Sequence, residues 1–147
     1  MSTHSMTTVG VQQLVPLLMV KDMKRSLSFY VEGLGFEIKN TWTPEGRIRW
    51  CWLELGGAAL MLQERVTYDP HGNKATQLDE NVGAGVGFNY QCRDAIAFYK
   101  IVKARGLSVR NPFVGNNMWV ASLSDPDGYS LHFQSPTDAP EESEYQE

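Results

Sequence analysis

Apolar and polar residues alternate with a period of two along most of this chain, which is the pattern of half-buried β-strands. Two segments instead repeat their apolar residues every three to four positions, as an amphipathic helix does. Asp22 and Asp94 precede these segments and are expected to cap helices at about residues 23–32 and 95–103. The strands are expected at residues 12–20, 36–43, 47–55, 58–65, 84–91, 107–114, 118–124 and 129–134.

The expected elements follow the same order in both halves of the chain: strand, helix and three strands. The halves also share a short motif, because SFY at residues 28–30 follows Asp22 and AFY at residues 97–99 follows Asp94. This pattern predicts a twofold internal repeat of a βαβββ unit. One face of each sheet is covered by its helix and the other is bare, so two units can form a curved sheet around a ligand cavity.

The predicted fold is therefore α+β, with two βαβββ modules forming a curved mixed sheet around a cup. Pro16 interrupts the first strand and indicates an edge position, because proline has no N–H to donate. The long polar loop between the modules is typical of a linker or a lid. The expected boundaries are a disordered tail at 1–10, one domain at 11–136 with module one at 11–66, a linker loop at 67–83 and module two at 84–136, and a solvated acidic tail at 137–147.

Charge and composition exclude several classes of protein. Asp and Glu number 17 against 13 Lys and Arg, a net charge of −4, so no basic patch for nucleic acid is expected. No apolar run is long enough for a membrane span, and no signal-peptide pattern opens the chain, so a cytoplasmic protein is expected. The two cysteines, Cys51 and Cys92, have no zinc-site or disulfide spacing. Cys51 is expected to be a packed thiol between two tryptophans.

Five short motifs in this order resemble the vicinal oxygen chelate superfamily, also called the glyoxalase/bleomycin resistance protein/dioxygenase family. It includes glyoxalase I, extradiol dioxygenases, fosfomycin-resistance enzymes and bleomycin-resistance proteins. The resemblance covers residues 14–136 and implies the paired βαβββ fold, which hosts several unrelated activities. The motifs are VKD at 20–22, SLSFY at 26–30, GLGF at 33–36, LELGG at 53–57 and DPDGY at 125–129.

Enzymes of this family place four metal ligands in the cup, one on each of four strands. The resemblance puts these positions at Val15, Met61, Gly87 and His132. Only His132 offers a suitable donor, because divalent metals need oxygen or imidazole nitrogen from several groups. No metal and no cofactor are therefore expected. A slip of the alignment by one residue, which would also exchange the two faces of a strand, would bring in Gln13, Gln63, Asn89 or Gln91.

The strand alternation also predicts which side chains line the cup. Trp50, Trp52 and Glu54 share one face of their strand, and an aromatic wall beside a carboxylate suits a flat or cationic ligand. The alternative is that the tryptophans pack under the helices or at a dimer interface. The candidate ligand-binding residues are Trp50, Trp52, Glu54, Met61, Gln63, Asn89, Gln91, Trp119, His132 and Gln134.

A cup without its metal ligands resembles the bleomycin-resistance branch of the family. That resemblance implies a homodimer that exchanges an N-terminal strand around a proline, and Pro16 is a candidate for that proline. It also implies that a small aromatic or amphipathic molecule is bound without chemistry. The alternatives are a divalent-metal-dependent lyase, isomerase or dioxygenase of the glyoxalase type, and a metal-free enzyme in which His132 is the base.

Overall fold

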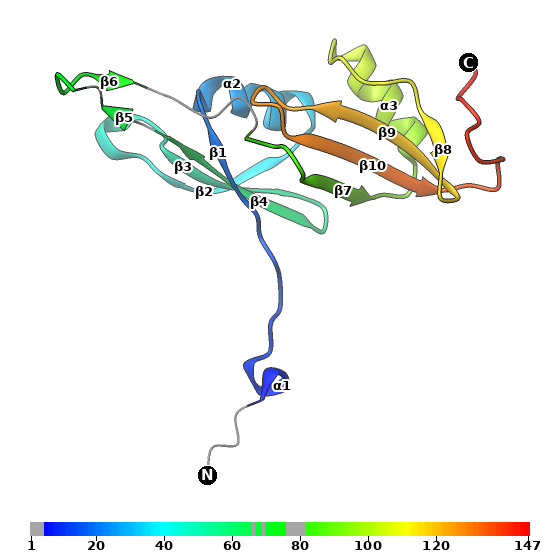
Figure 1. The fold of residues 1–147 in the computed structure, drawn as a ribbon, viewed down its shortest axis with the longest axis horizontal. Helices are drawn as coiled ribbons and strands as arrows, with labels where there is room; N and C mark the ends of the chain where they lie inside the picture. Colours follow the sequence, from blue (N-terminus) through cyan, green and yellow to red (C-terminus); the bar gives the residue numbers. More distant parts are fainter. Residues whose placement is uncertain (1–4, 66, 69, 76–81) are drawn as a thin grey trace.

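The computed structural model describes residues 5–65, 67–68, 70–75 and 82–147. Its longest strands and its longest helix lie in the two βαβββ units (Figure 1). The elements in chain order are α1 (Met6–Val9), β1 (Leu17–Val20), α2 (Met23–Leu27), the π-helix η1 (Ser28–Gly33), β2 (Glu37–Trp42), the short 3₁₀ turn η2 (Pro44–Gly46), β3 (Trp50–Leu55), β4 (Ala58–Glu64), β5 (Thr67–Tyr68), β6 (Lys74–Ala75), β7 (Gly87–Gln91), α3 (Ala95–Ala104), β8 (Phe113–Gly115), β9 (Met118–Ser124) and β10 (Ser130–Pro136).

The described strands form two four-stranded sheets of identical topology and one small hairpin. The strand order is β1-β4-β3-β2 in module one and β7-β10-β9-β8 in module two, and β5 pairs with β6. In each large sheet the first strand runs parallel to the last, and the other neighbours are antiparallel. The two sheets lie side by side along the long axis of the molecule (Figure 1). The predicted α+β fold with a repeated βαβββ unit is confirmed.

Both predicted aspartate caps are present. The Asp22 carboxylate accepts from the N–H of Arg25 at 3.3 Å, and the Asp94 carboxylate accepts from the N–H of Ala97 at 2.9 Å. The first helix differs from the prediction because only α2 is α-helical and its continuation η1 is a wider π-helix. Apolar periodicity does not distinguish these two helix types over so few residues.

One aromatic core joins the two modules. Phe36 of module one packs edge-on against Tyr90 of β7, with ring centroids 6.2 Å apart. Tyr90 stacks on Phe133 of β10 at 4.4 Å, and Phe133 stacks on Phe98 of α3 at 3.7 Å. All four rings belong to or border one buried cluster, so the described residues of both modules share a single core.

Hydrogen bonds from the turn before β10 also tie module two to module one. The buried Tyr30 hydroxyl donates to Oδ2 of Asp125 at 2.8 Å. Asp127 accepts from the N–H of Lys21 at 3.2 Å, and the Tyr129 hydroxyl donates to the carbonyl of Met19 at 3.0 Å. These contacts hold the two sheets in a defined relation because each side chain reaches across the boundary between the modules.

β1 and β8 start furthest from the predicted beginning of their strands, and a proline directly precedes each one. β1 begins after Pro16 and β8 begins after Pro112, whereas the predicted strands began at residues 12 and 107. The carbonyl of Pro16 still accepts from the N–H of Met61 at 2.8 Å. A proline can accept but cannot donate in a β-ladder, and each of these strands starts directly after that gap.

The terminal segments also differ from the predictions. The helical turn α1 lies within the segment predicted to be a disordered tail, and residues 1–4 of that segment lie outside the described residues. Likewise β5 and β6 occupy part of the predicted linker loop, of which residues 69 and 76–81 lie outside the described residues.

The acidic residues of the C-terminal tail are exposed, as expected, but the backbone of the tail is also held against module two. The N–H groups of Glu142 and Tyr145 donate to the carbonyls of Val114 and Pro112, each at 2.9 Å. The Tyr145 ring lies 6.0 Å from Tyr99 and 6.1 Å from Trp119. The tail therefore docks along the open edge of β8 through its backbone and Tyr145, while its glutamates remain exposed to solvent.

Candidate functional site

The sheet of module one presents an aromatic surface on the side away from α2. Cys51 and Leu53 of β3 are 0% exposed and face the helix side, so the alternate residues Trp50, Trp52 and Glu54 face the opposite side. There the indole N–H of Trp52 donates to Oε2 of Glu54 at 2.8 Å. The three side chains thus share one face of β3, as alternation predicts, and the structure shows that this face is the one away from α2.

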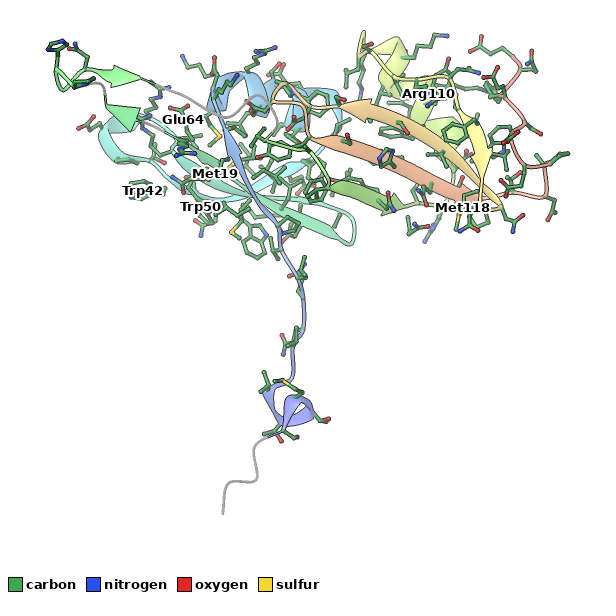
Figure 2. The ribbon with its side chains drawn as sticks, viewed as in Figure 1. Met19, Trp42, Trp50, Glu64, Arg110 and Met118 are labelled. Carbon is green, nitrogen blue, oxygen red and sulfur yellow. The ribbon has the colours of Figure 1, made fainter. Side chains whose placement is uncertain are left out.

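Neighbouring strands extend this surface with sulfur and aromatic side chains. Met61 and Gln63 of β4 lie opposite Trp52 and Trp50, and Trp42 of β2 also lies opposite Trp50. Met19 of β1 lies opposite Gln63 on its other side. Figure 2 labels Met19, Trp42 and Trp50, which lie on this sheet. We define the aromatic face as Met19, Trp42, Trp50, Trp52, Glu54, Met61 and Gln63.

Trp42 and Met19 belong to this face but are not among the residues that strand alternation predicted for the site. A β-bulge between Ile38 and Asn40 shifts the register of β2, so counting residues from the start of the strand assigns Trp42 to the wrong face. Trp42 is 56% exposed, which makes it the most exposed large aromatic side chain among the described residues. That exposure makes it the outer wall of the aromatic face.

The sheet of module two presents a polar surface on the corresponding side. His132 and Gln134 of β10 lie opposite Asn89 and Gln91 of β7, and the Gln91 amide donates to the Gln134 amide oxygen at 3.1 Å. Ser122 of β9 lies opposite His132 on its other side, with Oγ 2.8 Å from Nδ1. We define the polar face as Gly87, Asn89, Gln91, Ser122, His132 and Gln134.

Ser122 is the member of the polar face that the sequence analysis missed. Its strand has apolar residues on both sides, so alternation alone does not reveal which residues face the cup. The register with β10 supplies that information, because it places Ser122 directly opposite His132. Asn89, Gln91, His132 and Gln134, which were predicted to line the cup, share this face.

Trp119 lies on the opposite side of its sheet from the predicted site. It shares the helix side of β9 with Ala121, which is 0% exposed and pairs with the buried Phe133. Its ring contacts Tyr145 of the docked tail. Trp119 therefore lies on neither the aromatic face nor the polar face, in line with the alternative that a tryptophan packs on the helix side.

The two faces are open in the single chain. Trp42, Asn89 and Gln91 are exposed, and within the described part of the chain no hydrogen bond or ring contact joins the aromatic face to the polar face. A groove of about 740 Å³ runs between the modules, lined by Leu14 and Pro16, by the turn between β3 and β4, and by β7. Asn89 and Gln91 lie on both the groove and the polar face.

Burial makes the thiol of Cys51 a poor nucleophile. The residue is 0% exposed, and this burial raises its pKa to about 11. Its sulfur lies 4.0 Å from the Met23 sulfur beneath α2. The expected packed thiol is therefore what the structure contains.

The residues at the four metal-ligand positions of the family's enzymes do not provide a metal-binding site in this protein. The four implied positions hold Val15 in the N-terminal arm, Met61, Gly87 and His132, so imidazole is the one good donor among them. Among the described residues no three His, Cys, Asp or Glu side chains gather into a site for a metal ion. A divalent metal needs at least three such ligands, so these positions carry no metal-dependent step.

These features define a class of protein: two fused βαβββ modules, each with one sheet face that its helix leaves uncovered. The chain belongs to the glyoxalase/bleomycin resistance protein/dioxygenase superfamily, whose family model matches residues 10–133.

Solved structures of similar fold include proteins that bind antibiotics. A bleomycin-binding protein in complex with bleomycin has a TM-score of 0.63 and 23% identity, and covers 85% of this chain and 98% of its own. A bleomycin resistance determinant encoded on the transposon Tn5 has a TM-score of 0.65 and 22% identity, with coverages of 88% and 100%. An antibiotic-binding protein from a Streptomyces strain has a TM-score of 0.64 and 22% identity, with coverages of 87% and 98%. At these identities the likeness establishes the fold.

A curated relative is described as a probable chloroplastic lactoylglutathione lyase of Arabidopsis thaliana. It is 30% identical over 128 residues, which is 82% of this chain and 35% of the relative. The chain thus spans about a third of that relative's length. Separately, none of the helices in the described residues is both long and apolar enough to cross a membrane.

Proposed function

We propose that this protein binds a small aromatic or amphipathic molecule between the aromatic face and the polar face, without chemistry. The observation that supports this most is the open surface of Trp42, Trp50 and Trp52 beside Glu54. Indole rings attract flat and cationic groups, and a carboxylate beside them adds to the attraction for a cation. The solved bleomycin complex of a similar fold supports the same kind of ligand.

We also propose that a second copy of the chain completes the site. The N-terminal arm leads away from the body (Figure 1), and its residues Met6, Val9, Val11 and Leu14 are between 62% and 84% exposed. Four apolar side chains on one projecting segment are costly to leave in water. A homodimer in which each arm packs on the partner would cover them.

A fluorescence titration tests the binding proposal. Bleomycin and a planar aromatic cation such as acridine orange are added to the full chain, and tryptophan emission is followed. Saturable quenching is expected, and Trp52→Phe should weaken binding by up to about tenfold because phenylalanine has a smaller ring with a weaker cation–π attraction and no indole N–H. Trp119→Phe is the matched control, since that ring lies on the helix side. Absence of saturable quenching for both probes would contradict the proposal.

Charge gives a second readout of the same titration. Glu54→Gln keeps the hydrogen-bonding shape beside Trp52 but removes the negative charge. It should weaken binding of the acridine cation and leave a neutral aromatic of the same size unaffected. Equal weakening of both ligands would show that Glu54 acts through shape rather than through charge.

Sedimentation equilibrium tests the dimer. The wild-type chain should sediment as a dimer, and Leu14→Asp should shift it toward monomer because a charge replaces an apolar contact of the arm. Ile101→Asp, at a 50% exposed apolar position on α3, is the control for adding a charge elsewhere. A monomeric wild-type protein, or a dimer that Leu14→Asp leaves intact, would contradict the arm's role.

A metal-dependent lyase is the second candidate function, and the curated relative's name is what favours it. The donor set of the cup does not support it, because His132 stands alone among the four implied positions. An assay of lactoylglutathione cleavage with added Zn²⁺, Ni²⁺ or Mn²⁺ separates the two functions. Turnover that depends on the metal would replace the binding proposal.

A further inference from the structure

His132 and Ser122 form a pair whose geometry fixes one edge of the imidazole ring. They lie directly opposite each other on antiparallel strands, and the Ser122 Oγ is 2.8 Å from Nδ1 of His132. This bond engages one ring nitrogen and leaves Nε2 directed away from β9. In the described part of the chain no hydrogen bond to Nε2 is present.

A glycine keeps the Nε2 edge of His132 open. Gly87 lies on the neighbouring strand β7, and a Cβ placed there would lie 3.4 Å from both Nε2 and Cδ2 of His132. Any side chain at position 87 would extend from that point over the ring edge. The glycine therefore leaves space for a ligand atom to approach Nε2.

The hydrogen bond between Ser122 and Nδ1 of His132 influences whether Nε2 donates or accepts a hydrogen bond. A serine hydroxyl can donate to Nδ1, and the ring proton then resides on Nε2, the tautomer that neutral imidazole side chains favour in water. When the ring is protonated, both nitrogens carry a proton and Nε2 still donates. In the arrangement in which Ser122 donates, Nε2 is a hydrogen-bond donor in both charge states and has no free lone pair with which to act as a base.

We propose that His132, held by Ser122, is a donor subsite for an acceptor oxygen of the bound molecule. Resting on the proposed binding function, this inference narrows the ligand class to aromatic molecules that carry a carbonyl, phenolate or similar oxygen. The aromatic part stacks on the aromatic face, and the oxygen accepts from Nε2 on the polar face. Ser122 is a positioning residue because it acts through His132.

Two fluorescent probes that differ in one acceptor group test the subsite. Anilinonaphthalene sulfonate and N-phenylnaphthylamine share the same aromatic amine, and only the first carries sulfonate oxygens. In the wild-type protein both should bind. His132→Phe should weaken the sulfonate probe by about tenfold or more while the other probe changes little, since a bond to a charged acceptor is lost.

The serine is tested with a matched pair of variants. Ser122→Ala should reduce the preference for the sulfonate probe, and Ser122→Thr should restore it because the hydroxyl is kept. Ser124→Ala is the control, since Ser124 lies on the same face of β9 but pairs with Ser130 rather than with His132. An equal effect of Ser122→Ala and Ser124→Ala would overturn the positioning role.

Nitrogen-15 NMR of the imidazole ring provides a direct measurement without ligand. The neutral ring of His132 should carry its proton on Nε2 in the wild-type protein, and Ser122→Ala should give a mixture of tautomers. A proton on Nδ1 in the wild-type protein would overturn the donor subsite while leaving the binding proposal standing. Failure of both probes to bind the wild-type protein would instead overturn the proposed function, and the subsite with it.

Discussion

Removing one hydroxyl at the boundary between the modules is expected to destabilise the fold by about 2 kcal/mol. Tyr30 is 0% exposed, and its hydroxyl donates to Oδ2 of Asp125 at 2.8 Å. Oδ1 of Asp125 accepts from the N–H groups of Asp127 and Tyr129, each at 2.9 Å. In Tyr30→Phe, Oδ2 therefore loses its partner at a residue that is 5% exposed, where water does not readily replace it.

The loss in Tyr30→Phe should depend on pH because the acceptor is a carboxylate. Burial raises the pKa of Asp125, while the hydrogen bond from Tyr30 opposes that rise. Because the pKa of Asp125 is higher in the folded state than in the unfolded state, the folded state binds more protons at this carboxyl group at pH values between the two. The free energy of unfolding therefore falls as pH rises through that range. Without the hydroxyl the folded pKa of Asp125 rises further. The penalty should thus be largest at neutral pH and should shrink as pH falls through the folded pKa.

Urea unfolding at two pH values measures this penalty. The free energy of unfolding is compared at about pH 7.5 and about pH 5 for wild type and Tyr30→Phe, at one protein concentration. Tyr129→Phe is the control, since its hydroxyl donates to the neutral carbonyl of Met19, and about 1 kcal/mol should be lost at both pH values. A loss in Tyr30→Phe below about 0.5 kcal/mol, or one that does not change with pH, would refute the reasoning.

Three further substitutions test contacts that hold the fold. Glu64→Gln should cost about 3 kcal/mol in urea unfolding, because this 3% exposed carboxylate accepts from two arginines and a backbone N–H. Gly83→Ala should lower the midpoint temperature of thermal unfolding, because the new Cβ would lie 2.9 Å from the carbonyl oxygen of Gly128. Gly57→Ala is the control, since a Cβ at that position would have no atom within 4 Å. Tyr145→Ala should cost about 2 kcal/mol by removing two ring contacts of the tail, and an unchanged midpoint would mean that the tail is dispensable.

The site illustrates which inferences a periodic pattern permits. Alternation groups Trp50, Trp52 and Glu54 on one face because successive side chains of any strand point to opposite sides. Alternation does not indicate whether that face lies against the helix or on the open side of the sheet. The direction follows from the burial of Cys51 and Leu53 under α2, and that burial exists only when the helix packs on the sheet.

Trp119 and Ser122 lie on a strand where alternation of hydrophobic and polar residues cannot predict which side chains share a face. Their strand β9 has buried residues in succession, Val120 and Ala121, so its hydrophobicity does not alternate. The face of each residue then depends on the register with β10, which joins Trp119 to Ser135 and Ser122 to His132. Hydrophobicity therefore suggested Trp119 for the site and gave no indication of Ser122.

Local chemistry alone determined the repeated βαβββ order, the two aspartate caps and the side-chain grouping within each regular strand. These features depend on neighbours within a few positions, and such neighbours are visible in the sequence. The tertiary structure decided the orientation of each face, the bulge that turns Trp42 outward and the docking of the tail on β8. Each of these depends on contacts between residues far apart in the chain, such as Tyr30 with Asp125, whose energies no local pattern records.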